Sequence, residues 1–114
     1  MIEGLWSISF SAVDQPQDDV GAGVVVFETL RVFGGDSIYF YTGNYSITSE
    51  NQIKANVSVN HYFGPPLSIF GPLETFTIIL SGAIAADEFH THGYVKENPL
   101  LKLNVKFVKR AELP

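Results

Sequence analysis

The sequence contains no cysteine among its 114 residues. This absence excludes disulfide bonds, thiol nucleophiles and cysteine-ligated metal sites. The chain also lacks an apolar run of roughly 18 residues, the length that a membrane-spanning helix needs. Its first residues lack the basic and long apolar segments of a secretory signal peptide. We therefore expect a cytoplasmic protein that does not enter a membrane.

Basic residues are also few, because seven Lys and Arg stand against twelve Asp and Glu, for a formal net charge of -5. An acidic protein repels a phosphate backbone, so nucleic acid is not an expected partner. Several basic residues do gather near the C-terminus, but their spacing on a predicted strand indicates a solvated face. They are Lys96, Lys102, Lys106, Lys109 and Arg110.

Helical periodicity is missing, since no window of helical length shows an apolar repeat of 3.6 residues. Residues 4–11 alternate instead, with Trp6, Ile8 and Phe10 on one face and serines on the other. One dry face and one wet face are typical of a strand in an antiparallel sheet. Seven further segments have strand character, at residues 20–28, 31–33, 37–47, 52–62, 73–86, 89–96 and 101–108.

These eight segments are joined by short connections, which predicts an all-β fold in up-and-down antiparallel order. The length suits one domain, residues 1–114. Eight strands can close into a barrel that is wide enough for side chains or for one small ligand. We predict such a closed, lipocalin-like barrel, because the terminal strands carry no obvious protection of a free edge. A two-sheet sandwich is the alternative.

Large apolar side chains that point inward would either fill the barrel or line a ligand cavity. Filling is the favoured interpretation, because the chain is shorter than a typical lipocalin. An aromatic lining that binds a lipid or a flat apolar molecule is the alternative. The side chains concerned are Trp6, Ile8, Phe10, Phe76, Ile78, Leu80, Val105 and Phe107.

Residues 64–72 hold apolar side chains between three prolines, and they either fold over a barrel mouth or form an interface. Residues 38–41 are apolar on both faces, which leaves more apolar surface than one barrel interior can take. Tyrosine suits interfaces because it has an apolar body and a polar tip. We therefore expect a homodimer. The expected interface residues are Tyr39, Tyr41, Leu67, Ile69 and Phe70.

Three segments together resemble the GrlR family, negative regulators of type III secretion in Gram-negative bacteria. They are residues 3–10 (EGLWSISF), residues 34–36 (GGD) followed by Tyr39, Tyr41 and Gly43, and residues 68–71 (SIFG). The resemblance implies a dimerising lipocalin-like barrel that sequesters a transcriptional activator through an acidic surface loop. The corresponding turn here, residues 47–52, holds only the acid Glu50 where the family's best-known member has two Glu-Asp pairs. We expect a regulatory protein that binds another protein; the alternative is a carrier or sensor of a small apolar ligand.

The Gly4-x-Trp6 pair also resembles the start of lipocalins, in which a basic residue near the end of the last strand often covers the tryptophan. Alternation along residues 101–108 assigns this role to Lys109. A bulge near residues 107–108 would assign it to Arg110 instead.

No segment carries a catalytic signature, so we expect no enzymatic activity and no cofactor. His90 and His92 lie two residues apart and, with His61 and Glu88, have the residue types of a zinc site. The favoured interpretation is that these histidines face solvent, because no further metal-binding motif accompanies them. Asp36 follows two glycines and is expected to cap its own turn.

Overall fold

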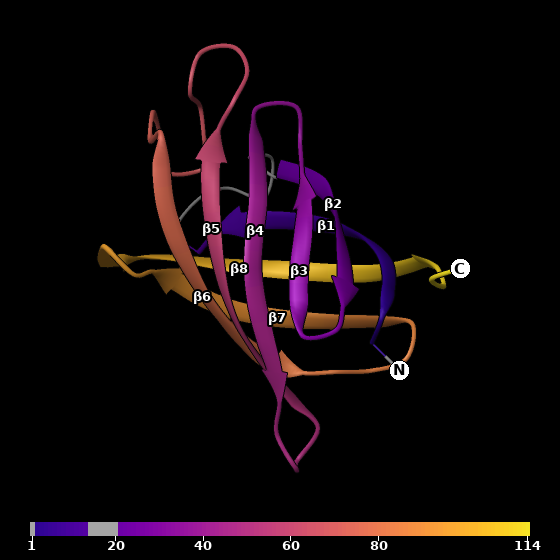
Figure 1. The fold of residues 1–114 in the computed structure, drawn as a ribbon. Helices are drawn as coiled ribbons and strands as arrows, with labels where there is room; N and C mark the ends of the chain where they lie inside the picture. The colour runs from indigo at the N-terminus through magenta and orange to yellow at the C-terminus, as the bar shows by residue number, and fades with distance from the viewer. Residues whose placement is uncertain (1, 14–20) are drawn as a thin grey trace.

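Eight strands follow one another along the chain, and each pairs antiparallel with its successor (Figure 1). This computed structural model describes residues 2–13 and 21–114. The strands are β1 (Gly4–Ala12), β2 (Gly21–Glu28), β3 (Arg31–Gly35), β4 (Tyr39–Ile47), β5 (Gln52–His61), β6 (Thr75–Ala83), β7 (Glu88–Val95) and β8 (Asn98–Ala111).

Pairing between β1 and β8 closes the sheet into a barrel, with Ile8 opposite Phe107. The predicted all-β, up-and-down barrel is therefore confirmed, and the sandwich alternative is excluded. No helix in the described part of the chain is long and apolar enough to cross a membrane.

The strand order gives the barrel two different ends. One end carries both termini and the turns at residues 29–30, 48–51 and 84–87, and we call it the closed end. The other end carries the connections at residues 36–38, 62–74 and 96–97, and we call it the mouth. Residues 14–20, between β1 and β2 in the sequence, lie outside the described part of the chain.

A cluster of aromatic rings, which we call the aromatic plug, fills the closed end of the barrel. Trp6 is 0% exposed and contacts Phe89 edge-on, with their ring centroids 5.0 Å apart. Phe89 stacks on Phe107 at 4.7 Å, and Phe27 lies 5.1 Å from Tyr45. The indole Nε1 of Trp6 donates a hydrogen bond to the carbonyl oxygen of Ile2 at 2.8 Å. The N-terminal segment therefore contributes to the covering of this end.

Lys109 covers the tryptophan, as strand alternation predicted. Its Nζ lies 5.8 Å from the centroid of the Trp6 ring, and its side chain is only 11% exposed. A bulge does occur, but it lies after Lys109: Trp6 is opposite Lys109 and Leu5 is opposite Ala111, so Arg110 is the extra residue. Arg110 points outward and donates a hydrogen bond from Nε to the Ser7 hydroxyl. The solvated face predicted for the C-terminal basic residues is therefore wrong for Lys109.

The last strand begins at Asn98, three residues earlier than the sequence indicated. This strand includes Pro99, although proline lacks the N–H donor that a ladder needs. The structure accommodates it because the register jumps from Tyr94 opposite Lys102 to Val95 opposite Asn98. Residues 99–101 therefore fall in an irregularity of the ladder, which is where proline is tolerated in sheets.

Candidate functional site

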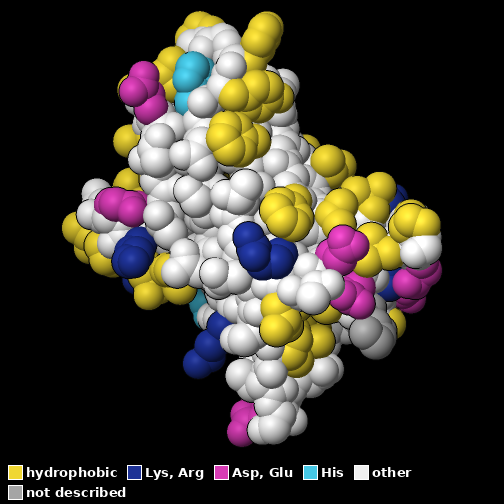
Figure 2. All heavy atoms as spheres, viewed as in Figure 1, with side chains coloured by type: hydrophobic (Ala, Val, Ile, Leu, Met, Phe, Trp, Pro, Cys, Tyr) yellow, Lys and Arg dark blue, Asp and Glu magenta, His cyan; other side chains and the backbone are white. Residues whose placement is uncertain are grey.

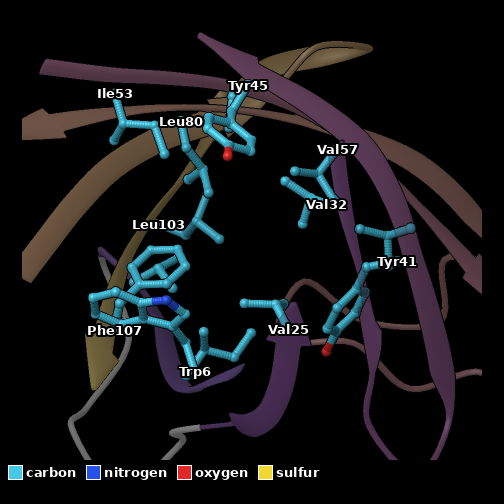
Figure 3. Packing of buried hydrophobic residues seen from close by; sticks show 14 of the residues in the cluster. Trp6, Val25, Val32, Tyr41, Tyr45, Ile53, Val57, Leu80, Leu103 and Phe107 are labelled. Carbon is cyan, nitrogen blue, oxygen red and sulfur yellow. The ribbon is translucent and has the colours of Figure 1, made fainter. Parts of the chain in front are cut away.

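The barrel interior contains a cavity of about 560 Å³, whose wall runs from the plug rings of Phe27 and Phe107 to residues at the mouth. Volumes of about 300–1,000 Å³ are typical of small-molecule sites. Figure 3 shows the side chains of Val25, Val32, Val57 and Leu103 around an open centre, with Trp6 and Phe107 together at one side. The interior therefore has room for a ligand.

Seven of the eight side chains predicted to line the barrel do line this cavity: Ile8, Phe10, Phe76, Ile78, Leu80, Val105 and Phe107. Trp6 points inward as predicted, but it is not among the cavity-lining residues, because its ring is enclosed in the aromatic plug.

The expectation that large side chains fill the whole barrel is wrong, and the distribution of side-chain size explains why. The rings of the aromatic plug pack at the closed end, and a second set of rings, which includes Tyr39 and Phe76, lies near the mouth. The wall between them carries smaller side chains on β2, β3 and β5. Examples are Val25, Val32, Ala55, Val57 and Val59. Small and β-branched side chains reach less far toward the barrel axis, so the interior stays hollow above the plug.

Close packing near the mouth depends on two inward-facing glycines of β2. A Cβ on Gly21 would lie 2.2 Å from the Phe10 ring, so this ring lies directly over the glycine. A Cβ on Gly23 would lie 2.7 Å from the carbonyl oxygen of Gly35 and 3.1 Å from the Tyr41 hydroxyl. The missing side chains of these glycines therefore make room for an aromatic ring and for a tyrosine hydroxyl.

The proline-rich connection lies at the mouth. Ser68 and Gly71 exchange backbone hydrogen bonds of 2.9 and 3.0 Å, which forms a tight turn. Ile69 and Phe70 pack against the core, with the Phe70 ring centroid 6.3 Å from that of Phe76. Leu67 also lines the cavity but is 66% exposed. Of the two alternatives for this loop, folding over the mouth thus describes Ile69 and Phe70, whereas Leu67 remains available at the surface.

Tyr39 and Tyr41 were expected at an interface, but they point into the barrel and are only 3% and 7% exposed. The ladder decides this: Tyr41 pairs with the inward-facing Val59, which leaves Phe40 on the outer face. The sequence could not decide it, because residues 38–41 are all apolar or aromatic. These two tyrosines belong to the cavity wall.

Asp36 is the only carboxylate in the cavity wall among the described residues. One oxygen, Oδ1, accepts hydrogen bonds from the backbone N–H groups of Ile38 and Tyr39, both at 2.8 Å, so the predicted turn cap is confirmed. The other oxygen, Oδ2, accepts a short hydrogen bond from the Tyr41 hydroxyl. Burial, followed by this hydrogen bond, raises the pKa of Tyr41 well above its ordinary value. The described part of the wall thus has one carboxyl group, and it lies at the mouth.

Thr91 is a buried polar residue of the wall that the sequence analysis did not single out. It lies on β7 two residues after the inward-facing Phe89, so strand alternation could have identified it. Its Oγ1 donates a hydrogen bond to the carbonyl oxygen of Val105 at 3.3 Å.

The three histidines do not come together. His90 and His92 are exposed on β7, and the only ion-pair partner that the described residues offer His90 is Glu88, at 3.9 Å. His61 lies at the end of β5, where Nε2 contacts the carbonyl oxygens of Phe63 and Gly64. No group of three His, Asp or Glu side chains among the described residues is arranged to hold a metal ion.

Glu50 lies exposed in the turn between β4 and β5, at the closed end. Its backbone N–H donates to the Thr48 hydroxyl at 3.3 Å. The turn therefore presents a single carboxylate, at the end of the barrel opposite the mouth.

Aromatic side chains also gather on the outer face near the mouth, and Figure 2 shows hydrophobic side chains on this side of the molecule. We call Phe33, Phe40, Tyr62 and Phe63 the outer aromatic patch; their exposed fractions lie between 43% and 68%. The Phe40 and Tyr62 rings are 6.1 Å apart, and the Arg31 guanidinium lies 5.9 Å from the Phe33 ring. Clustered exposed apolar side chains are typical of interaction surfaces.

The comparisons with known proteins add no assignment to this geometry. No protein-family model matches the chain, and a search of the curated proteins finds no significant match. The resemblance to the GrlR family therefore remains a prediction from the sequence.

Proposed function

We propose that this protein binds one small, largely apolar molecule inside the barrel. The observation that carries the proposal is the cavity of about 560 Å³, whose wall is built mainly from Val, Ile, Leu and Phe side chains. A cavity with an apolar wall and a few polar groups at one end has the composition of ligand sites in proteins. The aromatic plug supplies stability at the closed end, so the open half of the barrel is free to hold a ligand.

The test is a binding titration with two neutral probes. The fluorescent dye N-phenyl-1-naphthylamine should increase its emission when it enters the cavity, and 1-decanol should displace it. Because a ligand that binds only the folded state stabilises it by mass action, 1-decanol should also raise the melting temperature. The proposal fails if neither probe binds at submillimolar concentration.

A matched pair of variants locates the binding. Val57→Trp places an indole in the centre of the cavity and should abolish dye binding, because Val57 points inward from the middle of β5. Asn56→Trp places the same ring on the outer face, since successive residues of a strand face opposite sides. This control should bind the dye as the wild type does. Equal binding by both variants would place the dye outside the barrel.

A second candidate function is protein binding, as the resemblance to the GrlR family implies, and the outer aromatic patch favours it. We commit to a second copy of this chain as the occupant of the patch. The four side chains of the patch are uncharged, so two copies can bury them against each other, with Arg31 at the border of the contact. Such self-complementarity is what a twofold interface requires.

Light scattering at tens of micromolar should then give the mass of a dimer. The double variant Phe33→Ser and Phe40→Ser should give the monomer mass of 12.6 kDa. Tyr94→Ser removes another exposed aromatic side chain, from β7, and should leave the dimer intact. A monomeric wild type would contradict the proposed interface. A regulatory role further requires a protein such as a transcriptional activator, which affinity capture from the native host would reveal.

A further inference from the structure

Four of the five side-chain hydroxyls in the described cavity wall donate hydrogen bonds within the protein, and the fifth belongs to Ser37 at the exposed rim. The Tyr39 hydroxyl donates to the carbonyl oxygen of Leu73, and the Tyr41 hydroxyl donates to Asp36. The Ser68 hydroxyl donates to the carbonyl oxygen of Gly71 at 2.8 Å, and the Thr91 hydroxyl donates to Val105. A hydroxyl has one proton to donate, so none of these four side chains has a donor left for a ligand.

Acceptor capacity remains in the same wall. A carboxylate oxygen can accept about two hydrogen bonds. Oδ2 of Asp36 accepts only one among the described residues, from Tyr41. The Thr91 oxygen has its two lone pairs in addition to the proton that it donates. The cavity therefore offers acceptors to a ligand, with the strongest of them at the mouth.

The charge of the wall points the same way. No Lys, Arg or His side chain lines the cavity in the described ranges 2–13 and 21–114, whereas Asp36 does. Lys109, which is near the barrel interior, lies at the closed end over the Trp6 ring. An anionic head group at the mouth would lie close to this carboxylate, and like charges at short distance repel. A cationic donor would form a charge-assisted hydrogen bond there.

We infer that the ligand class of this cavity is an apolar molecule with a cationic amine head group, which Asp36 binds at the mouth. This inference rests on the proposed function, because it specifies the ligand of the same cavity. The apolar body extends toward the aromatic plug, and the amine donates to the carboxylate. Neutral alcohols bind through their apolar body, and fatty-acid anions are disfavoured.

The test compares three ten-carbon compounds with different head groups: decylamine, 1-decanol and decanoate, each below its micelle-forming concentration at pH 7. Their affinities are measured by displacement of N-phenyl-1-naphthylamine from the wild-type protein. Decylamine should bind at least roughly tenfold more tightly than decanoate, the factor expected for one charge-assisted hydrogen bond. The affinity of 1-decanol should lie between the two.

Two variants and one control variant test the role of the carboxylate. Asp36→Asn keeps an oxygen that can cap the turn and removes the charge, so the preference for decylamine over decanoate should fall by roughly tenfold. Ser37→Lys adds a cation beside it at an exposed position of the cavity rim, so this variant should fold and should favour decanoate. Ser46→Lys adds the same charge at an exposed position far along β4 and should leave the preference unchanged.

The outcomes separate the two proposals. If neither the dye nor any of the three compounds binds, both the proposed function and the amine inference fail. If 1-decanol binds but decanoate binds as tightly as decylamine, the cavity is a ligand site and the inference about its head group is wrong. An unchanged head-group preference in Ser37→Lys would likewise overturn the role of the mouth carboxylate, even if Asp36→Asn does not fold.

Discussion

The division of the barrel into a plugged half and a hollow half predicts that one truncation has different effects in the two halves. Phe89 belongs to the aromatic plug, is buried, and forms close ring pairs with Trp6 at 5.0 Å and with Phe107 at 4.7 Å. Phe10 lines the cavity near the mouth, with its ring over Gly21 and only partly buried. Replacing each phenylalanine by leucine is the same chemical change in two environments.

The expected cost is larger in the plug. Phe89→Leu loses two aromatic pairs, each contributing roughly 0.5–1.5 kcal/mol. It also leaves a small void among rigid rings, and each Å³ of such a void lowers the stability by about 24 cal/mol. Together these effects destabilise the protein by about 2 kcal/mol. Phe10→Leu removes atoms that already border empty space, so it should cost less than about 1 kcal/mol.

Equilibrium urea unfolding with each variant measures this difference, provided that the slope with denaturant stays unchanged. In thermal unfolding, a domain of this size should lose about 8 °C through Phe89→Leu and less than about 4 °C through Phe10→Leu. Dye binding should persist in Phe10→Leu, because the cavity becomes larger. Equal losses of stability, or a larger loss for Phe10→Leu, would refute the conclusion that the mouth half is hollow.

Three further predictions concern a turn, a titration and a cation. Thr29 and Leu30 form the two-residue turn after β2 with φ of 50° and 65°, values that Asn and Gly adopt more easily than Thr and Leu. The double variant Thr29→Asn and Leu30→Gly should therefore be more stable by about 1 kcal/mol in urea unfolding. A less stable double variant would contradict the conclusion that these two residues are strained. Because the pKa of Tyr41 is raised in the folded protein, the unfolded chain loses its proton first above about pH 10, and stability should fall with pH there by up to about 1.4 kcal/mol per unit. Tyr41→Phe should make that fall less steep, and an unchanged slope would contradict the raised pKa. Lys109→Met should lower the free energy of unfolding in urea by about 1 kcal/mol, because the contact between the ammonium group and the Trp6 ring is lost. The control Lys106→Met, on the outer face of the same strand, should change it little. Equal losses for both variants would argue against a stabilising contact at Trp6.

Alternation along the chain predicted much of the fold because the side-chain period of a strand is a local property. Residues 4–11 and 52–62 have one dry and one wet face, and β1 and β5 bury the predicted sides. Seven of the eight side chains that the same rule predicted to line the barrel do line the cavity. It failed for Tyr39 and Tyr41, because a strand that is apolar on both faces carries no signal of which face is buried.

Closure and hollowness depend on residues that are distant in sequence. The ring closes because β1 pairs with β8, and this register places Lys109 over Trp6 and pushes the bulge to Arg110. A cavity exists because large rings from distant strands pack together near the two ends of the barrel, while smaller side chains of β2, β3 and β5 face each other between them. No single strand contains that information.

From the sequence alone, it was possible to determine that this is a cysteine-free all-β domain whose first strand buries Trp6, since composition and period-two alternation are properties of short segments. Only the tertiary structure decided that the barrel closes, that its mouth half is hollow, and that Asp36 and Tyr41 meet in the cavity wall. The physical reason is that these properties depend on contacts between distant segments. The register depends on which strands pair, and the free volume inside the barrel depends on which side chains of different strands face each other. Those contacts also brought the one carboxylate of the described wall to the place where a ligand head group would lie.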